Sequence, residues 1–244
     1  MAKRKTRKKS SRAKKKTTSQ RRFLRRVARG AGAAVLGFAA VFAMLLLLGR
    51  FVGPWTTPFM FSESYRLGGV SYEWVSIEEV APVMARSVVA AEDANFCQHW
   101  GFDLGAIRDA IEDGGTRGAS TISQQVVKNL YLWHGRSYTR KALETFMTPA
   151  LEAFWPKRRI VEVYLNIAEF DEGVFGAEAA ARHYFGVSAA DLSAAQAARL
   201  AAVLPDPKGR SASRPSAFVQ RRARAIADGA ALIRKDGRAA CFES

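Results

Sequence analysis

Acidic residues are missing from the first part of the chain, although basic residues are abundant there. Residues 1–29 contain 15 Lys and Arg and no Asp or Glu. Taking these from the totals of 38 basic and 22 acidic residues leaves 23 and 22 in the other 215 positions, which are close to neutral. The net charge of +16 therefore does not mark the whole chain as a nucleic-acid binder. A like-charged segment with few hydrophobic residues is expected to be disordered.

Cysteine is also scarce, with only Cys97 and Cys241. Two cysteines are too few for a small fold held together by disulfides, and their spacing fits no zinc site. In an oxidising compartment the two could pair, which would clamp the C-terminal residues beside residues 92–101. Two unrelated thiols are the alternative, because sequence alone gives no distance between them.

Charge of either sign is absent from Gly30–Gly49, a run of 20 residues. At about 1.5 Å per residue, a helix of this length spans roughly the 30 Å of a bilayer core. A cleavable signal peptide is the competing interpretation, but the basic region is too long and no small-x-small cleavage site follows. The pattern predicts one transmembrane helix, with residues 1–29 in the cytoplasm and the remainder exported.

Alternating Val, Ile and Thr of the kind that predicts strands is not convincing anywhere, and no internal repeat is evident. The fold class is therefore predicted to be mostly α. Residues 50–75 are interpreted as an irregular juxtamembrane linker, because glycines and prolines recur there. Residues 76–244 are long enough for one domain with its own core.

Helix boundaries are signalled in several places within this domain. Residues 177–185 are expected to form a helix that ends at Gly186. An apolar stripe predicts an amphipathic helix and consists of Leu143, Phe146, Met147, Ala150, Leu151 and Phe154. Capping boxes mark three starts: Ser76 with Glu79, Thr121 with Gln124, and Ser193 with Gln196.

Two polar runs in the first half of the domain carry the chemistry. Residues 92–101 read Glu-Asp-Ala-Asn-Phe-Cys-Gln-His-Trp-Gly and follow the apolar stretch Val88–Ala91. A carboxylate there can be partly desolvated and ready to accept a proton. Residues 118–129 begin a helix with hydroxyls, amides and Lys128, a composition that suits an anionic, polar substrate.

Two further runs follow in the same order along the chain. The third contains Arg140-Lys141, Glu144 and Glu152, and the fourth contains Lys157, Ile160, Glu162 and Tyr164-Leu165-Asn166. Taken alone, Arg140 and Glu144 fit a simple ion pair on a helix surface, since they lie four residues apart.

Together, behind one membrane anchor, the four runs resemble the biosynthetic peptidoglycan glycosyltransferases, glycosyltransferase family 51. The similarity is strongest to the single-domain, monofunctional transglycosylases and includes the transglycosylase domain of class A penicillin-binding proteins. Tyr72-Glu73-Trp74-Val75 and Arg221-Arg222 match further blocks of the family pattern. The resemblance covers about residues 70–226.

The resemblance implies a lysozyme-like helical domain that polymerises lipid II into glycan strands, with inversion and release of a polyprenyl diphosphate. It assigns Glu92 as the catalytic base and Glu144 as the second catalytic carboxylate. It allows a divalent cation, Mg²⁺ or Mn²⁺, as the only cofactor, with no metal ligands assigned. The residues expected to bind substrate are Lys128, Arg140, Arg117, Ser120, Thr121, Gln124, Gln125, Asn129, His99 and Asp93.

The expected partners are lipid II, the growing glycan strand and the bacterial inner membrane. Other proteins of cell-wall synthesis or division could join them, whereas nucleic acid is not expected. The domain would lie in the periplasm behind a single-pass anchor whose N-terminus is cytoplasmic. Two rivals stay open: a lysozyme-like enzyme that cleaves glycan, which would share a catalytic Glu, and a non-catalytic, membrane-tethered scaffold.

Overall fold

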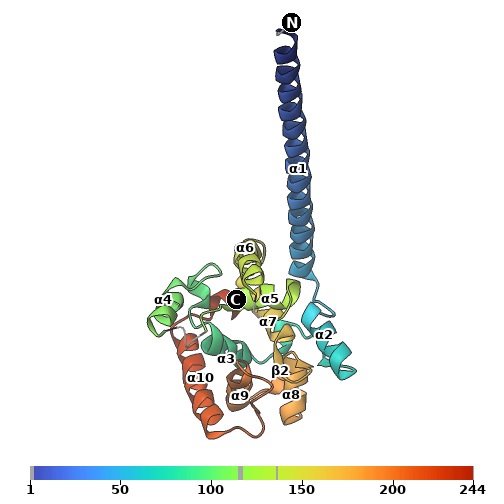
Figure 1. Ribbon diagram of the computed structural model, residues 1–244. Helices are drawn as coiled ribbons and strands as arrows, with labels where there is room; N and C mark the ends of the chain where they lie inside the picture. Colours follow the sequence, from blue (N-terminus) through green and yellow to red (C-terminus); the bar gives the residue numbers. More distant parts are fainter. Residues whose placement is uncertain (1–2, 115–117, 136, 244) are drawn as a thin grey trace. The chain divides into compact units, whose positions relative to one another are not determined.

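The structure is a computed structural model that describes residues 3–114, 118–135 and 137–243 (Figure 1). It contains two compact units, Met1–Leu48 and Gly49–Ser244. The first unit consists of most of helix α1 (Lys3–Phe51). Within the described residues, Phe23–Phe51 is the one helical stretch long and apolar enough to cross a membrane, and it contains the span predicted from sequence.

The basic tail continues the same helix, where the sequence predicted disorder. Helical backbone begins at Lys3 and runs without interruption into the apolar stretch. Lys and Arg are good helix formers, and extending an existing helix avoids the cost of a new nucleus. The prediction of a disordered tail is therefore wrong for residues 3–29.

The second unit is mainly helical, as predicted, with one small sheet. Its single 3₁₀ turns are η1 (Ile77–Glu79), η2 (Phe96–Gln98) and η3 (Ala189–Asp191). Its strands β1 (Ser71–Tyr72), β2 (Glu169–Asp171) and β3 (Val174–Phe175) lie in the order β1-β3-β2, with β1 parallel and β2 antiparallel to β3. Its α-helices are α2 (Pro58–Leu67), α3 (Pro82–Glu92), α4 (Leu104–Glu112), α5 (Ile122–Tyr131), α6 (Tyr138–Phe154), α7 (Lys157–Ile167), α8 (Ala177–Phe185), α9 (Ala194–Val203), α10 (Ala217–Lys235) and α11 (Ala240–Glu243).

Helix α2 corrects the prediction that residues 50–75 are irregular throughout. Thr57 is its N-cap and accepts a hydrogen bond from the backbone N–H of Met60, while Pro58 occupies the first turn. Gly68 ends the helix in the left-handed conformation. A Thr-Pro start and a Gly end are recognised helix signals, so the sequence did contain this element.

The core that carries the site is built from α3, α9 and α10, which pack on one another. Helix α9 contributes a run of buried alanines and Leu200. Small side chains let neighbouring helices approach closely, and a Cβ added at Gly229 of α10 would lie 3.3 Å from the Cβ of Ala90 in α3. This packing fixes the last turn of α3, where Glu92 stands.

The apolar stripe predicted for α6 is only partly buried. Leu151 is fully buried, but the side chain of Phe146 is 86% exposed and Phe154 is also exposed. Periodicity alone cannot tell which edge of a wide stripe meets the core. The stripe therefore predicted the helix but not which of its apolar side chains are buried.

Candidate active site

Glu92 lies at the C-terminal end of α3 with a mostly buried side chain. Its Oε2 accepts a hydrogen bond from Nε2 of Gln125 at 3.0 Å, and its Oε1 lies 3.9 Å from Nη2 of Arg222. Burial raises the pKa of the Glu92 carboxyl, and the contact with Gln125 and the charges of Arg222 and Lys128 offset this only in part. These are the properties required of a general base.

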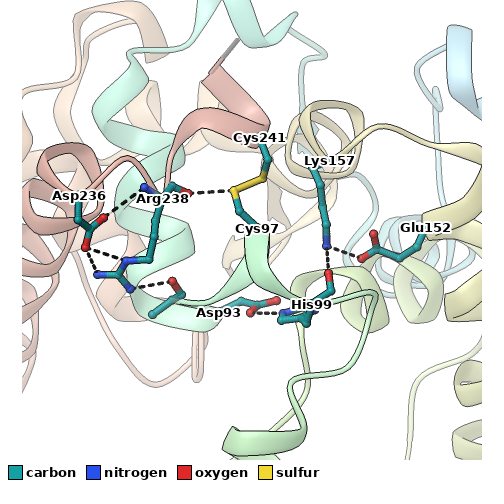
Figure 2. Close-up of a disulfide and its surroundings, with 9 residues drawn as sticks. Asp93, Cys97, His99, Glu152, Lys157, Asp236, Arg238 and Cys241 are labelled. Atoms are coloured by element: carbon teal, nitrogen blue, oxygen red, sulfur yellow. Dashed lines mark hydrogen bonds and ion pairs between the residues drawn. A yellow bond between two sulfur atoms is a disulfide. The ribbon is translucent and has the colours of Figure 1, made fainter.

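Asp93, the neighbouring acid, faces a different environment. Its Oδ2 accepts a hydrogen bond from the backbone N–H of Ile122 at 3.0 Å, and its Oδ1 lies 2.7 Å from Nε2 of His99 (Figure 2). The buried Asp93 therefore ties the end of α3 to the first residue of α5. Both Asp93 and His99, expected to bind substrate, are engaged with other protein groups here.

The start of α5 is held by Thr121, which forms the predicted capping box with Gln124. The Thr121 hydroxyl also donates to the carbonyl of Gly101 at 2.7 Å, and both capping side chains are buried. Ser120 accepts a hydrogen bond from Nζ of Lys141 at 3.4 Å. Thr121 and Gln124 therefore shape the site, whereas Gln125, on the next turn, contacts Glu92 and lines a cavity with Lys128.

Lys128 is partly buried, and none of the described residues accepts a hydrogen bond from its ammonium group. Burial lowers its pKa, against the opposing pull of the Glu144 and Glu92 charges. It lines a cavity of about 210 Å³ together with Gln125, Asn129, His134, Tyr164 and Glu169. The buried Oδ1 of Asn129 has no partner among the described residues, so the cavity offers an unsatisfied acceptor as well as a cation.

Glu144 is buried in α6 and is 3% exposed. Nη1 of Arg140 donates to its Oε2 at 2.8 Å, and Nζ of Lys141 donates to its Oε1. The predicted pair of Arg140 and Glu144 therefore exists, but it belongs to a three-membered cluster around a buried carboxylate, in which Arg140 is partly buried and Lys141 reaches the surface. The charge of Glu144 also acts on Lys128 and partly offsets the effect of burial on the pKa of its ammonium group.

The donor set at Glu144 does not fit a divalent cation, because both carboxylate oxygens already pair with cationic side chains. Among the described residues, Asp93, His99 and Asp103 form the one group of three acid or His residues whose candidate ligand atoms all lie within 4.8 Å of one another. Both carboxylate oxygens of Asp93 already take part in the contacts with His99 and Ile122. No step is therefore assigned to a metal.

Three residues that the structure shows to contact the site were not assigned to it from the sequence. Arg222 reaches Glu92 from α10, and Tyr164 of α7 donates a hydrogen bond to Oε1 of Gln125 at 3.3 Å. Lys157 links Glu152 to the backbone carbonyl of His99, with both contacts at 2.8 Å (Figure 2). All three lie in runs that the sequence analysis singled out, so the motifs contained the signal. Arg117, the remaining expected ligand, lies outside the described residues.

A disulfide joins Cys97 and Cys241, which confirms the pairing that the sequence left open. Figure 2 shows it beside the Asp93–His99 pair, with Cys97 in η2 and Cys241 in α11. The bond connects positions 144 residues apart.

The geometry suits a reaction in which a hydroxyl loses its proton to Glu92 while negative charge develops beside Lys128 and the α6 cations. Comparison with known proteins places the chain among enzymes that transfer glycosyl groups. The pattern of the transglycosylase family matches residues 62–231. The chain belongs to the transglycosylase family.

Several close relatives have the name biosynthetic peptidoglycan transglycosylase. A protein from Jannaschia sp. (strain CCS1) is 59% identical over 98% of this chain and 97% of its own length. A protein from Caulobacter vibrioides is 44% identical over 90% of this chain and 98% of its own length. One from Pseudomonas fluorescens (strain Pf0-1) is 52% identical over 83% and 87%. The likeness therefore extends over nearly the whole of both chains.

Proposed function

We propose that this glycosyltransferase builds peptidoglycan by polymerising lipid II into glycan strands. The observation that carries the proposal is the arrangement around Gln125: it binds the desolvated carboxylate of Glu92, and it lines one cavity with Lys128, a cation without a hydrogen-bonding partner among the described residues. Family membership and the names of the relatives support the same substrate class. The growing strand and lipid II are the two reactants.

Glu92 acts as the base in the proposed reaction. It takes the proton from the acceptor sugar hydroxyl, whose oxygen attacks the anomeric carbon of the donor from the face opposite the leaving group. The bond from that carbon to the diphosphate breaks, and the polyprenyl diphosphate leaves with the electron pair. This sequence inverts the anomeric centre and leaves the proton on Glu92.

The cationic side chains stabilise the departing diphosphate. Lys128 is free to receive a phosphate oxygen, and Arg140 has further N–H groups beyond the one that binds Glu144. Glu144 holds Arg140 and Lys141 through ion pairs with its two carboxylate oxygens. Its proposed role as a second catalytic carboxylate is thus to orient these cations for the transition state.

The amide groups provide contacts for sugar hydroxyls. Gln125 and Asn129 line the cavity, and the unpaired Oδ1 of Asn129 is an acceptor for a sugar hydroxyl or amide N–H. Ser120 stands next to Lys141 at the entrance of α5. A cation cluster of this kind gives a glycan-cleaving enzyme no advantage, because a glycan leaving group carries no diphosphate.

The transmembrane stretch accounts for how the enzyme meets its substrate. Phe23–Phe51 would anchor the domain to the inner membrane, with the basic N-terminal residues in the cytoplasm and the domain in the periplasm. The polyprenyl tail of lipid II stays in the bilayer, so the anchor keeps the site close to it. Contacts with other cell-wall synthesis or division proteins are compatible with this location.

The test uses the purified full-length protein and lipid II, with polymer measured by gel electrophoresis. Glu92→Gln keeps the shape and hydrogen bonding of the side chain but cannot take the proton, so the rate should fall by about 10²–10⁴. Glu112→Gln is the matched control, because Glu112 is an exposed acid in α4, and it should polymerise at the parent rate. Equal rates for both variants would exclude Glu92 as the base. If the protein cleaved finished glycan and made no polymer, the lytic enzyme would be favoured. If it showed neither activity, the non-catalytic scaffold would be favoured.

A further inference from the structure

The family match ends at residue 231, but the chain continues and returns to the catalytic segment. Helix α10 ends at Lys235, and residues 236–243 turn back at Gly237, which has a φ of +78°. Helix α11 then packs against η2 and α7. Figure 1 shows this last part of the chain next to α7. We call residues 236–243 the C-terminal brace.

The brace holds the residues that follow Glu92 through three kinds of contact. The disulfide joins Cys241 to Cys97. Nη1 of Arg238 donates to the backbone carbonyl of Ala94 at 3.1 Å, only two residues after Glu92. The buried ring of Phe242 lies 6.5 Å from that of Phe96.

Other contacts orient the brace itself. The carboxylate of Asp236 accepts hydrogen bonds from the backbone N–H of Arg238 at 3.2 Å and from its Nε at 2.8 Å, which aims the guanidinium at Ala94 (Figure 2). Glu243 forms an ion pair with Arg86 of α3, the helix that ends at Glu92. The brace therefore grips α3 and the segment after it.

The segment that the brace contacts, residues 93–101, has little regular secondary structure. Between Glu92 and Gly101 the only regular element is the single 3₁₀ turn η2. Each residue of such a loop resists ordering through its backbone entropy, so contacts from outside decide its conformation. Asp93, His99 and Lys157 hold it on the side of α5 and α7, and the brace holds it on the other side.

We propose that the C-terminal brace positions Glu92 for catalysis, and that the Cys97–Cys241 disulfide makes the rate of polymerisation depend on oxidation. The proposal rests on Glu92 being the base, as proposed above. Cys241, Arg238 and Phe242 act as positioning residues and touch no substrate. A base displaced by about 1 Å can lose ~10²-fold in rate, so a modest loosening of the segment is enough.

The reversible test is reduction of the disulfide in the full-length protein. A dithiol such as dithiothreitol supplies two electrons and two protons: the S–S bond gives two thiols, and the dithiol closes to its own disulfide. We expect kcat for lipid II polymerisation to fall ~10-fold or more, with KM changed less than about twofold, and to recover on reoxidation. Circular dichroism at the assay temperature verifies that the domain stays folded.

Variants separate positioning from simple stabilisation. Cys97→Ser/Cys241→Ser should have the low kcat of the reduced enzyme and no response to dithiol. Arg238→Ala keeps the disulfide and should lower kcat, whereas Lys235→Ala, an exposed cation just before the brace, should not. Loosening exposes Glu92 to water, so the acid limb of the kcat–pH profile should move to lower pH in the reduced enzyme. A stabilising role alone would leave this limb in place.

The outcomes distinguish this inference from the proposed function. An enzyme that polymerises lipid II equally well when folded and oxidised or folded and reduced would overturn the brace and leave the proposed function standing. An enzyme with no polymerase activity in either state would overturn the proposed function and the brace together. If the double cysteine variant does not fold, dithiol treatment of the parent and Arg238→Ala still decide the matter.

Discussion

At the scale of single residues, Glu92 determines the expected pH dependence. A base works only after it has lost its proton, and burial raises the pKa at which this carboxyl does so above its ordinary 4.5. The kcat for lipid II should therefore rise with pH through a midpoint above 4.5 and disappear on the acid side. A profile of kcat against pH checks this. A midpoint at or below the ordinary value would contradict the burial described for Glu92.

Asp93 gives a second prediction at this scale. Its carboxylate is buried and joins His99 to the first amide of α5, so Asp93→Asn should cost about 1–3 kcal/mol of unfolding free energy. Glu92→Gln should cost none at neutral pH, because it removes the need to ionise a buried carboxyl. Chemical denaturation of both variants measures the difference. A larger loss for Glu92→Gln would reverse the two roles.

The sequence indicated candidate site residues better than the contacts they make. Glu92 could be predicted because an acid at the end of an apolar helical run is visible in one segment. The contacts of Glu92 with Arg222, 130 positions later, and of Ser123 with Glu152 depend on how helices pack. The different contacts of the Glu92 and Asp93 carboxylates also needed the structure, since the two acids are neighbours in the sequence.

At the scale of elements, the capping box of α5 supports the site. Thr121→Ala removes the N-cap and should cost about 0.5–2 kcal/mol of stability. Ser193→Ala removes the corresponding cap of α9 and should cost a similar amount. Only Thr121→Ala should also lower kcat, because α5 carries Gln125 and Lys128. Equal kcat values for the two variants, measured well below their melting temperatures, would show that this cap serves stability alone.

Elements with local end signals were the predictable ones. Helix α8 ends before Gly186 as the sequence indicated, and all three capping boxes are present. The sheet could not be predicted, because strands of two or three residues are too short to alternate and depend on pairing between distant segments. Helix α2 was missed for another reason: the glycines and prolines around it were given more weight than its Thr57–Pro58 start.

At the scale of the whole molecule, charge asymmetry predicts topology. The 15 basic and no acidic residues of segment 1–29 should keep it in the cytoplasm and send the domain across the membrane. A reporter that works only in the periplasm should be active when fused after Ser244 and silent when fused before Met1. The opposite pattern would place the domain on the wrong side for lipid-linked glycan assembly and would contradict the proposed function.

The long interval between the two cysteines also has a consequence in time. Cys97 and Cys241 are separated by 144 residues. At a synthesis rate of about 5–20 residues per second, Cys241 is added to the chain roughly 7–30 s after Cys97. Cys97 must wait for its partner through that interval, and any earlier pairing would have to be with another molecule. If the brace governs the rate, a chain still being exported is a poor catalyst. Glycan synthesis would then begin only after the last helix has reached the same compartment as the first cysteine.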